Sequence, residues 1–243
     1  MRRLTLWFLA TAAWEVLSRI VPWIPSPVSV FRLVGSDLRD IQILTALAGS
    51  VRRMAIGFSG VLVFGIGTGI LLGRYRWLDD LFGTLAMALH AMPGAAWVPL
   101  AIILFGLNEW AVIFTILLGA TGIMMVSTSS GIKEVPPLLL QAAQTMGARG
   151  AKIFWHVIVP AAIPRIVDGL RLAWAFGWRA LMAGELMINS IQGMGQILSA
   201  VAKKGTMDQV LAFMIIIALI GMAVDGLIFR RLERLVQTRW GTV

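Results

Sequence analysis

The sequence predicts an all-α protein that crosses a membrane several times, and three observations support this fold class. Hydrophobic residues make up 58% of the chain and charged residues only 14%, whereas about a quarter of the residues of a soluble domain are charged. Apolar runs of about 20 residues, enough to cross the hydrocarbon core as a helix, recur along the chain. Basic residues gather at the edges of these runs, as they do in membrane proteins.

Six membrane-spanning helices account for the apolar runs. The expected spans cover residues 4–21, 54–73, 84–105, 110–128, 166–188 and 209–229. The first follows a basic start that is typical of a signal peptide, but no small-residue cleavage site comes after it. Because Glu15 and Arg19 stand four residues apart and can pair on one helix face, we expect a retained helix.

The third expected span contains His90, Pro93 and Pro99. Proline removes a backbone donor and bends a helix, and neighbouring helices can support such a bend inside a membrane. We therefore expect a kinked third span. Prolines between residues 22 and 27 argue against a span there, and a short surface helix is expected from Ser29 onward.

The distribution of Lys and Arg predicts the orientation of the chain. With both termini in the cytoplasm, the inner segments hold more basic residues than the outer segments, to which Arg52 and Arg53 belong. The formal net charge of +9 is therefore interpreted as a topology signal, and no nucleic-acid partner is expected. One membrane domain is expected over residues 1–243, with an extra N-terminal helix at 4–21, a core at 50–230 and a cytoplasmic loop at 133–164.

A polar stretch interrupted by glycine, residues 141–160, lies within the expected cytoplasmic loop. Its composition predicts a helix over 138–146, a break at Gly147 and a second short helix over 152–159 that stops at Pro160. Alanines on the first helix would let another protein approach the backbone closely. The alternative is an ordinary connecting loop that lies on its own bundle.

The same stretch resembles the cytoplasmic signature of the membrane subunits of binding-protein-dependent ATP-binding-cassette importers. In that signature Glu-Ala-Ala is followed by three residues, Gly, nine residues and then Ile, any residue, Leu and Pro. Here Gln141-Ala142-Ala143 stands at the start, Gly147 at the corner and Val157-Ile158-Val159-Pro160 at the end, with complete spacing. Gln141 replaces the family glutamate, which removes the charge from that position.

Further matches are similar to one branch of this family, the nitrate, sulfonate, taurine and bicarbonate permeases. They include Pro25-Ser26-Pro27, Ser50-Val51-Arg52-Arg53, Trp97-Val98-Pro99-Leu100, Gly169-Leu170-Arg171 and Gly193-Met194-Gly195. The resemblance covers roughly residues 25–236 and implies the type I importer permease fold. It also implies a small, anionic solute, with aliphatic sulfonate or taurine placed first and nitrate or bicarbonate second.

The resemblance implies that the loop docks onto a cytoplasmic ATPase. The residues expected to couple the two proteins are Gln141, Ala142, Ala143, Met146, Gly147, Ala148, Phe154 and Pro160. The chain lacks a Gly-rich phosphate loop ending in Lys-Ser or Lys-Thr, so it is not expected to be an enzyme, and ATP and Mg would bind the ATPase. Expected partners are a second copy of the chain, two ATPase subunits, an external solute-binding protein and the lipid of a bacterial cytoplasmic membrane.

The fifth expected span carries ionisable residues at membrane depth, where they are costly and usually face a cavity or a partner. A step of about 100° per residue places Asp168, Arg171, Arg179 and Glu185 within an arc of about 120°. The residues expected along a translocation path are Arg171, Trp174, Trp178, Arg179, Met182, Glu185 and Asn189. Arg179 could offer an anion a planar set of donors. The alternative is that Asp168 and Arg171 lie at the cytoplasmic interface, while Arg179 and Glu185 neutralise each other or neighbouring charges.

Candidates for contact with the binding protein stand in the expected outer segments. They are Asn108, Glu109, Lys203 and Lys204, for which a solvated loop is the alternative interpretation. Asp225 in the sixth span needs a structural partner that the sequence does not identify.

No catalytic or metal site is expected. The chain has no cysteine, and its two histidines, His90 and His156, are far apart. No nucleophile and base stand at a recognisable spacing, which argues against a membrane enzyme. The alternative function is a self-contained secondary transporter or channel that uses Arg179 and Glu185 as a charge relay.

Overall fold

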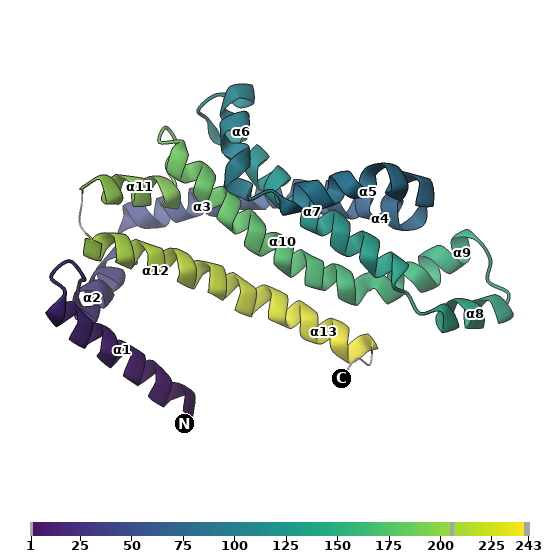
Figure 1. The fold of residues 1–243 in the computed structure, drawn as a ribbon, viewed down its shortest axis with the longest axis horizontal. Coiled ribbons are helices and arrows are strands. Elements are labelled where there is room, and N and C mark those ends of the chain that lie inside the picture. Colours follow the sequence, from purple (N-terminus) through teal and green to yellow (C-terminus); the bar gives the residue numbers. More distant parts are fainter. Residues whose placement is uncertain (1, 205–206, 241–243) are drawn as a thin grey trace.

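Helices alone make up the regular structure of the described residues. The computed structural model describes residues 2–204 and 207–240 (Figure 1). Its first half contains α1 (Arg2–Ile20), α2 (Pro27–Asp37), α3 (Ile41–Val61), the π-helical turn η1 (Leu62–Ile66), α4 (Gly67–Arg74), α5 (Arg76–Ala91), the 3-10 turn η2 (Gly94–Trp97) and α6 (Val98–Phe105). Its second half contains α7 (Glu109–Lys133), α8 (Pro137–Thr145), α9 (Ala151–Ile153), η3 (Phe154–Ile158), α10 (Val159–Met187), α11 (Met194–Lys204), α12 (Met207–Val224), η4 (Asp225–Phe229) and α13 (Arg230–Trp240). The expected all-α class is confirmed for these residues.

Four helical stretches are long and apolar enough to cross a membrane. They are Ile41–Arg74, Glu109–Lys133, Ala151–Met187 and Met207–Val236. A fifth is obtained if α5 and the following η2–α6 segment count as one span, although they meet at an angle of 102°. The bend predicted for the third span is therefore a sharp break at Met92 and Pro93, the two residues between the helical segments.

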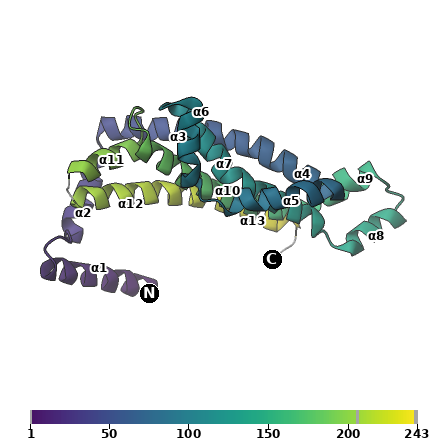
Figure 2. The ribbon, with the colours of Figure 1, turned by 45° about the horizontal axis from the view of Figure 1, so that its top comes forward.

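The first expected span forms a helix, α1, but is not among these candidates. Arg3, Glu15 and Arg19 lie toward the two ends of its 19 residues and shorten its apolar stretch, so the prediction of six spans is not confirmed. Glu15 and Arg19 do pair, at 3.1 Å. α1 packs on α2, partly through a hydrogen bond of 3.1 Å from Trp14 Nε1 to the Pro25 carbonyl. It lies apart from the remaining bundle in two views (Figure 1, Figure 2).

The core of the bundle is built around α7, which packs against α3, α4, α5, α6 and α10. Glycines on both sides bring the backbones together. A Cβ added at Gly65 would lie 2.6 Å from Met124, and one at Gly122 would lie 2.5 Å from the backbone nitrogen of His90. Close helix packing through small residues, which membrane proteins use in place of a hydrophobic driving force, therefore fixes the arrangement.

The second helix of the expected cytoplasmic loop does not stop at Pro160. The chain stays helical from Ala151 to Met187, so that boundary was wrong. The π-helical turn η3 explains the difference: the Val159 N–H donates to the carbonyl of Phe154, five residues back. This shifted hydrogen-bond ladder lets the helix continue although Pro160 has no N–H to donate.

Candidate functional site

The loop between α8 and α9 turns sharply at Gly147. Gly147 has φ +85° and Gly150 φ +54°, both on the side that favours glycine. The Ala148 N–H donates to the Ala143 carbonyl and the Gly147 N–H to the Gln144 carbonyl, each at 3.0 Å. These two bonds close the end of α8 in the pattern that a left-handed glycine permits. The predicted break at Gly147 is therefore confirmed.

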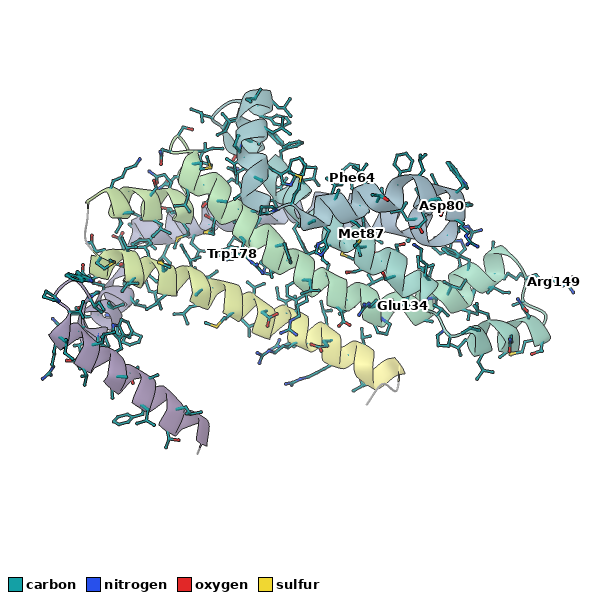
Figure 3. The ribbon with its side chains drawn as sticks, in the orientation of Figure 1. Phe64, Asp80, Met87, Glu134, Arg149 and Trp178 are labelled. Atoms are coloured by element: carbon teal, nitrogen blue, oxygen red, sulfur yellow. The ribbon has the colours of Figure 1, made fainter. Side chains whose placement is uncertain are left out.

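This loop lies at one end of the bundle, far from α2 and α11 (Figure 1). Arg149 lies at its extreme tip (Figure 3), and Met146 is 87% exposed beside it. Gln141, Ala142 and Gly147 are also exposed, and Ala148 and Pro160 are half-buried. We call the exposed corner from Gln141 to Gly150 the docking corner.

Two of the predicted loop residues do not face outward. Ala143 and Phe154 are buried. The Phe154 ring packs in a cluster with Ile132 and Ala162, and the guanidinium of Arg74 lies 4.2 Å from its centre. Phe154 therefore anchors the loop to the bundle, and the exposed residues of the docking corner form the surface that another protein can reach.

A groove of about 300 Å³ runs between α10 and α12, and Trp174, Trp178 and Arg179 line it. The two indole rings stack with centroids 6.4 Å apart and planes 14° from parallel. Their Nε1 atoms are buried, and within the described part of the chain neither has a hydrogen-bond acceptor. A second groove, of about 400 Å³, continues past Trp178 and Arg179 to Met182. Five residues of the predicted stripe therefore border this depression, which the two adjoining grooves form along α10: Arg171, Trp174, Trp178, Arg179 and Met182.

Arg179 is the exposed cation of this depression. Its Nε donates to the Ala175 carbonyl at 3.2 Å, and its guanidinium lies 4.8 Å from the centre of the Phe176 ring. Asn189 follows the last turn of α10 and is exposed. Arg179 and Glu185 do not pair with each other. Glu185 is instead neutralised by a neighbour, Arg53, which is the other part of that alternative.

Arg171 ties α10 to the last span. It donates two hydrogen bonds to Asp225, of 2.5 and 2.8 Å, and a third of 3.3 Å to Glu233. Arg171 is thus the structural partner that Asp225 needs, and most of its donors are used inside the chain.

Glu185 does not lie on the predicted stripe. It is fully buried, and its Oε1 accepts from Arg53 at 2.7 Å and from Ser50 at 2.9 Å. The prediction that Glu185 borders the path with Arg179 was wrong, because an arc of about 120° is wide enough to face two different neighbours. Arg53, expected as an outer charge, is likewise buried within the bundle. Gly193-Met194-Gly195 lies against this cluster, and its two glycines are the sequence feature that could have indicated a close approach there.

The four predicted outer residues have different surroundings. The Asn108 side chain accepts from the N–H groups of Trp110 and Ala111 and so caps α7. Glu109 forms an ion pair with Arg52, and Lys203 is exposed. The Lys204 side chain lies outside the described residues. Asn108 and Glu109 thus have structural roles, and the exposed side chain of Lys203 is the one among the described side chains of these four that takes part in neither a cap nor this ion pair.

Comparison with known proteins now identifies the family. The model described as the binding-protein-dependent transport system inner membrane component matches residues 63–241. The chain belongs to this family. It is 40% identical to a putative ABC transporter permease of Methanocaldococcus jannaschii, over 72% of this chain and 66% of that protein. The family inferred from the cytoplasmic signature is confirmed.

Two further relatives fall in the expected branch of this permease family. The chain is 32% identical to the taurine transport system permease of Escherichia coli, over 95% of this chain and 86% of that protein. It is 31% identical to the bicarbonate transport system permease of Synechococcus elongatus, over 72% of this chain and 63% of the relative. The predicted branch is thereby confirmed.

Solved permease structures have a similar fold. An inward-facing structure of the MetNI methionine ABC transporter covers 80% of this chain with TM-score 0.69 and 17% identity, over 96% of the solved chain. An amino acid ABC transporter crystallised with histidines covers 79% of this chain and 93% of the solved chain, with TM-score 0.64 and 14% identity. These similarities concern the fold alone.

Proposed function

We propose that this permease is the membrane subunit of an ATP-driven importer and that its docking corner receives force from a separate cytoplasmic ATPase. One observation carries the proposal: the exposed corner at Gly147 leads through η3 into the uninterrupted α10, which borders the groove at Trp178 and Arg179. Movement of the corner would therefore be transmitted directly to the groove. ATP and Mg bind the ATPase in this proposal.

Co-purification tests the docking corner. Ala142→Arg places a large cation on its exposed face and should release the ATPase while the permease still inserts in the membrane. Gly35→Arg is the control, because Gly35 lies in α2 at the other end of the bundle and has open space around it. Equal recovery of ATPase with both variants contradicts the proposal.

The complete assembly in this proposal contains two copies of the chain, two ATPase subunits and an external solute-binding protein. In this proposal it lies in a bacterial cytoplasmic membrane with both termini inside, an orientation that the bias of Lys and Arg supports and that requires α1 to cross the membrane as a sixth span. The whole chain, 1–243, acts as one membrane domain. Large exposed apolar side chains on α5 and α6, including Leu85, Ile103 and Leu104, are available to lipid or to the second copy.

The depression along α10 is the proposed route of the solute between the two copies. Arg179 supplies N–H donors and a positive charge at the wall of this groove, which suit a small anion with several acceptor oxygens. Sulfonates such as taurine fit this chemistry first, and nitrate or bicarbonate second. The relatives named for taurine and for bicarbonate support the same order of tests.

Uptake by Arg179→Met tests the route. We expect uptake to fall severalfold while assembly with the ATPase stays normal, because a hydrogen bond to a charged group contributes on the order of 1 kcal/mol or more. Arg19→Met is the control, since Arg19 lies on α1, away from the groove. Unchanged uptake by a normally assembled Arg179 variant excludes this role.

A secondary transporter with a relay from Arg179 to Glu185 is not favoured. Glu185 is paired with Arg53 and is buried, so the two proposed relay groups face different neighbours. Transport driven by an ion gradient, in vesicles that contain the permease without an ATPase, would support that alternative.

A further inference from the structure

A buried ionic cluster joins three helices at the end of the bundle opposite the docking corner. Arg53 of α3 donates to Glu185 of α10 through Nη2 at 2.7 Å and Nε at 3.0 Å. The side chains of Arg53 and Glu185 are 4% and 0% exposed. Ser50 adds a hydroxyl donor 2.8 Å from Glu185 Oε2.

The first turn of α11 is bound to the same cluster. The Gly195 N–H donates to Glu185 Oε2 at 3.0 Å, and the Met194 N–H donates to Ser50 Oγ at 3.0 Å. Arg53 Nη2 also donates to the Gln192 carbonyl at 2.7 Å. A carboxylate at this position satisfies free N–H groups of the helix and interacts favourably with its dipole. The start of α11 and the loop before it are thus held directly by the ion pair.

Two glycines allow this close approach. A Cβ added at Gly193 would lie 2.5 Å from the Glu185 carboxylate and 2.6 Å from Arg53 Nη2. A Cβ added at Gly195 would lie 2.6 Å from Glu185 Cβ and 2.9 Å from the Met182 carbonyl. No larger residue fits at either position without displacing α11.

The cluster lies near one end of a long helix, and the docking corner adjoins the other end of the same helix. The chain from Ala151 to Met187 is helical over 37 residues, a length of about 55 Å. Glu185 lies in its last turn, and α9 begins it beside Gly150. Figure 1 shows α11 and α8 at opposite ends of the bundle. A displacement of α11 therefore acts on the helix that leads to the docking corner.

We propose that the Arg53–Glu185 pair positions α11 so that α11 and α10 move together, and that the external binding protein thereby signals to the ATPase through α10. The inference rests on the proposed function for the existence of both partners. The pair itself contacts neither partner. It acts as a rigid joint, because separating two buried charges leaves each one unpaired.

The test compares two ATPase rates of the full complex in lipid nanodiscs. The first is the basal rate, and the second is the rate after addition of the solute-loaded binding protein. The double variant Arg53→Gln/Glu185→Gln removes both charges at once and leaves neither uncompensated. Arg52→Gln is the matched control, because Arg52 is the neighbouring residue and its ion pair with Glu109 is exposed, at 61% and 37%.

We expect the double variant to keep its basal rate and to lose stimulation by about fivefold or more, the lower end of usual coupling between sites. The Arg52 control should keep its stimulation. A purely structural role predicts a different result, with basal and stimulated rates falling in proportion to the amount of assembled complex. Proportional loss, or full stimulation of the double variant, overturns the inference.

A second variant decides the question if the double variant does not assemble. Gly195→Ala keeps both charges and displaces the first turn of α11, so it should also lose stimulation, whereas Arg53→Lys keeps a cation and should retain part of it. Retained stimulation in Gly195→Ala overturns the inference. If the wild-type permease binds no ATPase, the proposed function itself is contradicted. Failure of the proposed function is thereby distinguished from failure of this inference.

Discussion

Arg171 of α10 and Asp225 of η4 are joined by two parallel hydrogen bonds, from Nε to Oδ1 at 2.5 Å and from Nη2 to Oδ2 at 2.8 Å. The pair lies at one end of the groove that also contains Trp174 and Trp178. It fixes the distance between the helix that carries the docking corner and the last membrane span. This contact makes Arg171 a structural residue of the groove wall.

Asp225→Asn should weaken this contact between α10 and the last span. The side chain of Arg171 is 40% exposed, so solvent screening limits the expected loss of stability to about 1 kcal/mol. A melting curve of the purified permease measures it. Glu233→Gln, which weakens the longer bond of 3.3 Å from Arg171, should have a smaller effect. An equal or larger effect of the Glu233 variant contradicts the ranking.

Gly147→Ala should distort the docking corner and leave the bundle intact. An added Cβ meets no atom within 4 Å, so the cost comes from φ +85° alone, about 1–2 kcal/mol for an L-residue. ATPase co-purification should decrease, with an unchanged yield of folded permease. Gly35→Ala is the control, since Gly35 has the same free space and a regular helical conformation. Full ATPase recovery with Gly147→Ala contradicts the expectation that the positive φ at Gly147 is needed for ATPase binding.

Gly122→Ala should destabilise the permease strongly. The new methyl group would lie 2.5 Å from the backbone nitrogen of His90, and backbone cannot move aside as a side chain can. Overpacking of this kind costs about 1–3 kcal/mol or more. Gly67→Ala, with open space around it, should be neutral or stabilising by about 0.5–1 kcal/mol. Thermal unfolding of the two variants in detergent provides the comparison. Similar melting temperatures would contradict the close contact between Gly122 and the backbone of His90.

Phe154→Ala should detach the docking corner from the bundle. Phe154 is 4% exposed, and truncating a buried aromatic ring costs about 3–5 kcal/mol. We expect greater protease sensitivity near Gly147 and reduced ATP-dependent uptake. The neighbouring Trp155 is 56% exposed, so Trp155→Ala should leave the proteolysis pattern unchanged. An identical pattern in both variants argues against the anchoring role.

Much of the fold follows from features that the sequence shows directly. Apolar length finds the spans that lie within Ile41–Arg74 and Glu109–Lys133, although the first of these helices begins well before Met54. Glycine chemistry locates the corner at Gly147. Pro160 was misinterpreted because a π-helical turn, which depends on packing around Phe154, carries the helix past it. Helical steps placed Arg179 and Trp178 on one side correctly but could not show which neighbour Glu185 faces. Its partner Arg53 lies 132 residues away, a separation that no local pattern reveals.

The π-helical turns give the long helices a way to change register without breaking. Three of the four membrane-spanning stretches contain a π-helical turn. It is η1 in Ile41–Arg74, η3 in Ala151–Met187 and η4 in Met207–Val236. A π turn holds one inserted residue, so its migration by a few positions rotates the side chains that it passes by about 100°. At η4 such a rotation would swing the Asp225 carboxylate away from Arg171, and at η3 it would turn the residues that follow Phe154. These helices can therefore twist in segments while their ends keep their hydrogen bonds.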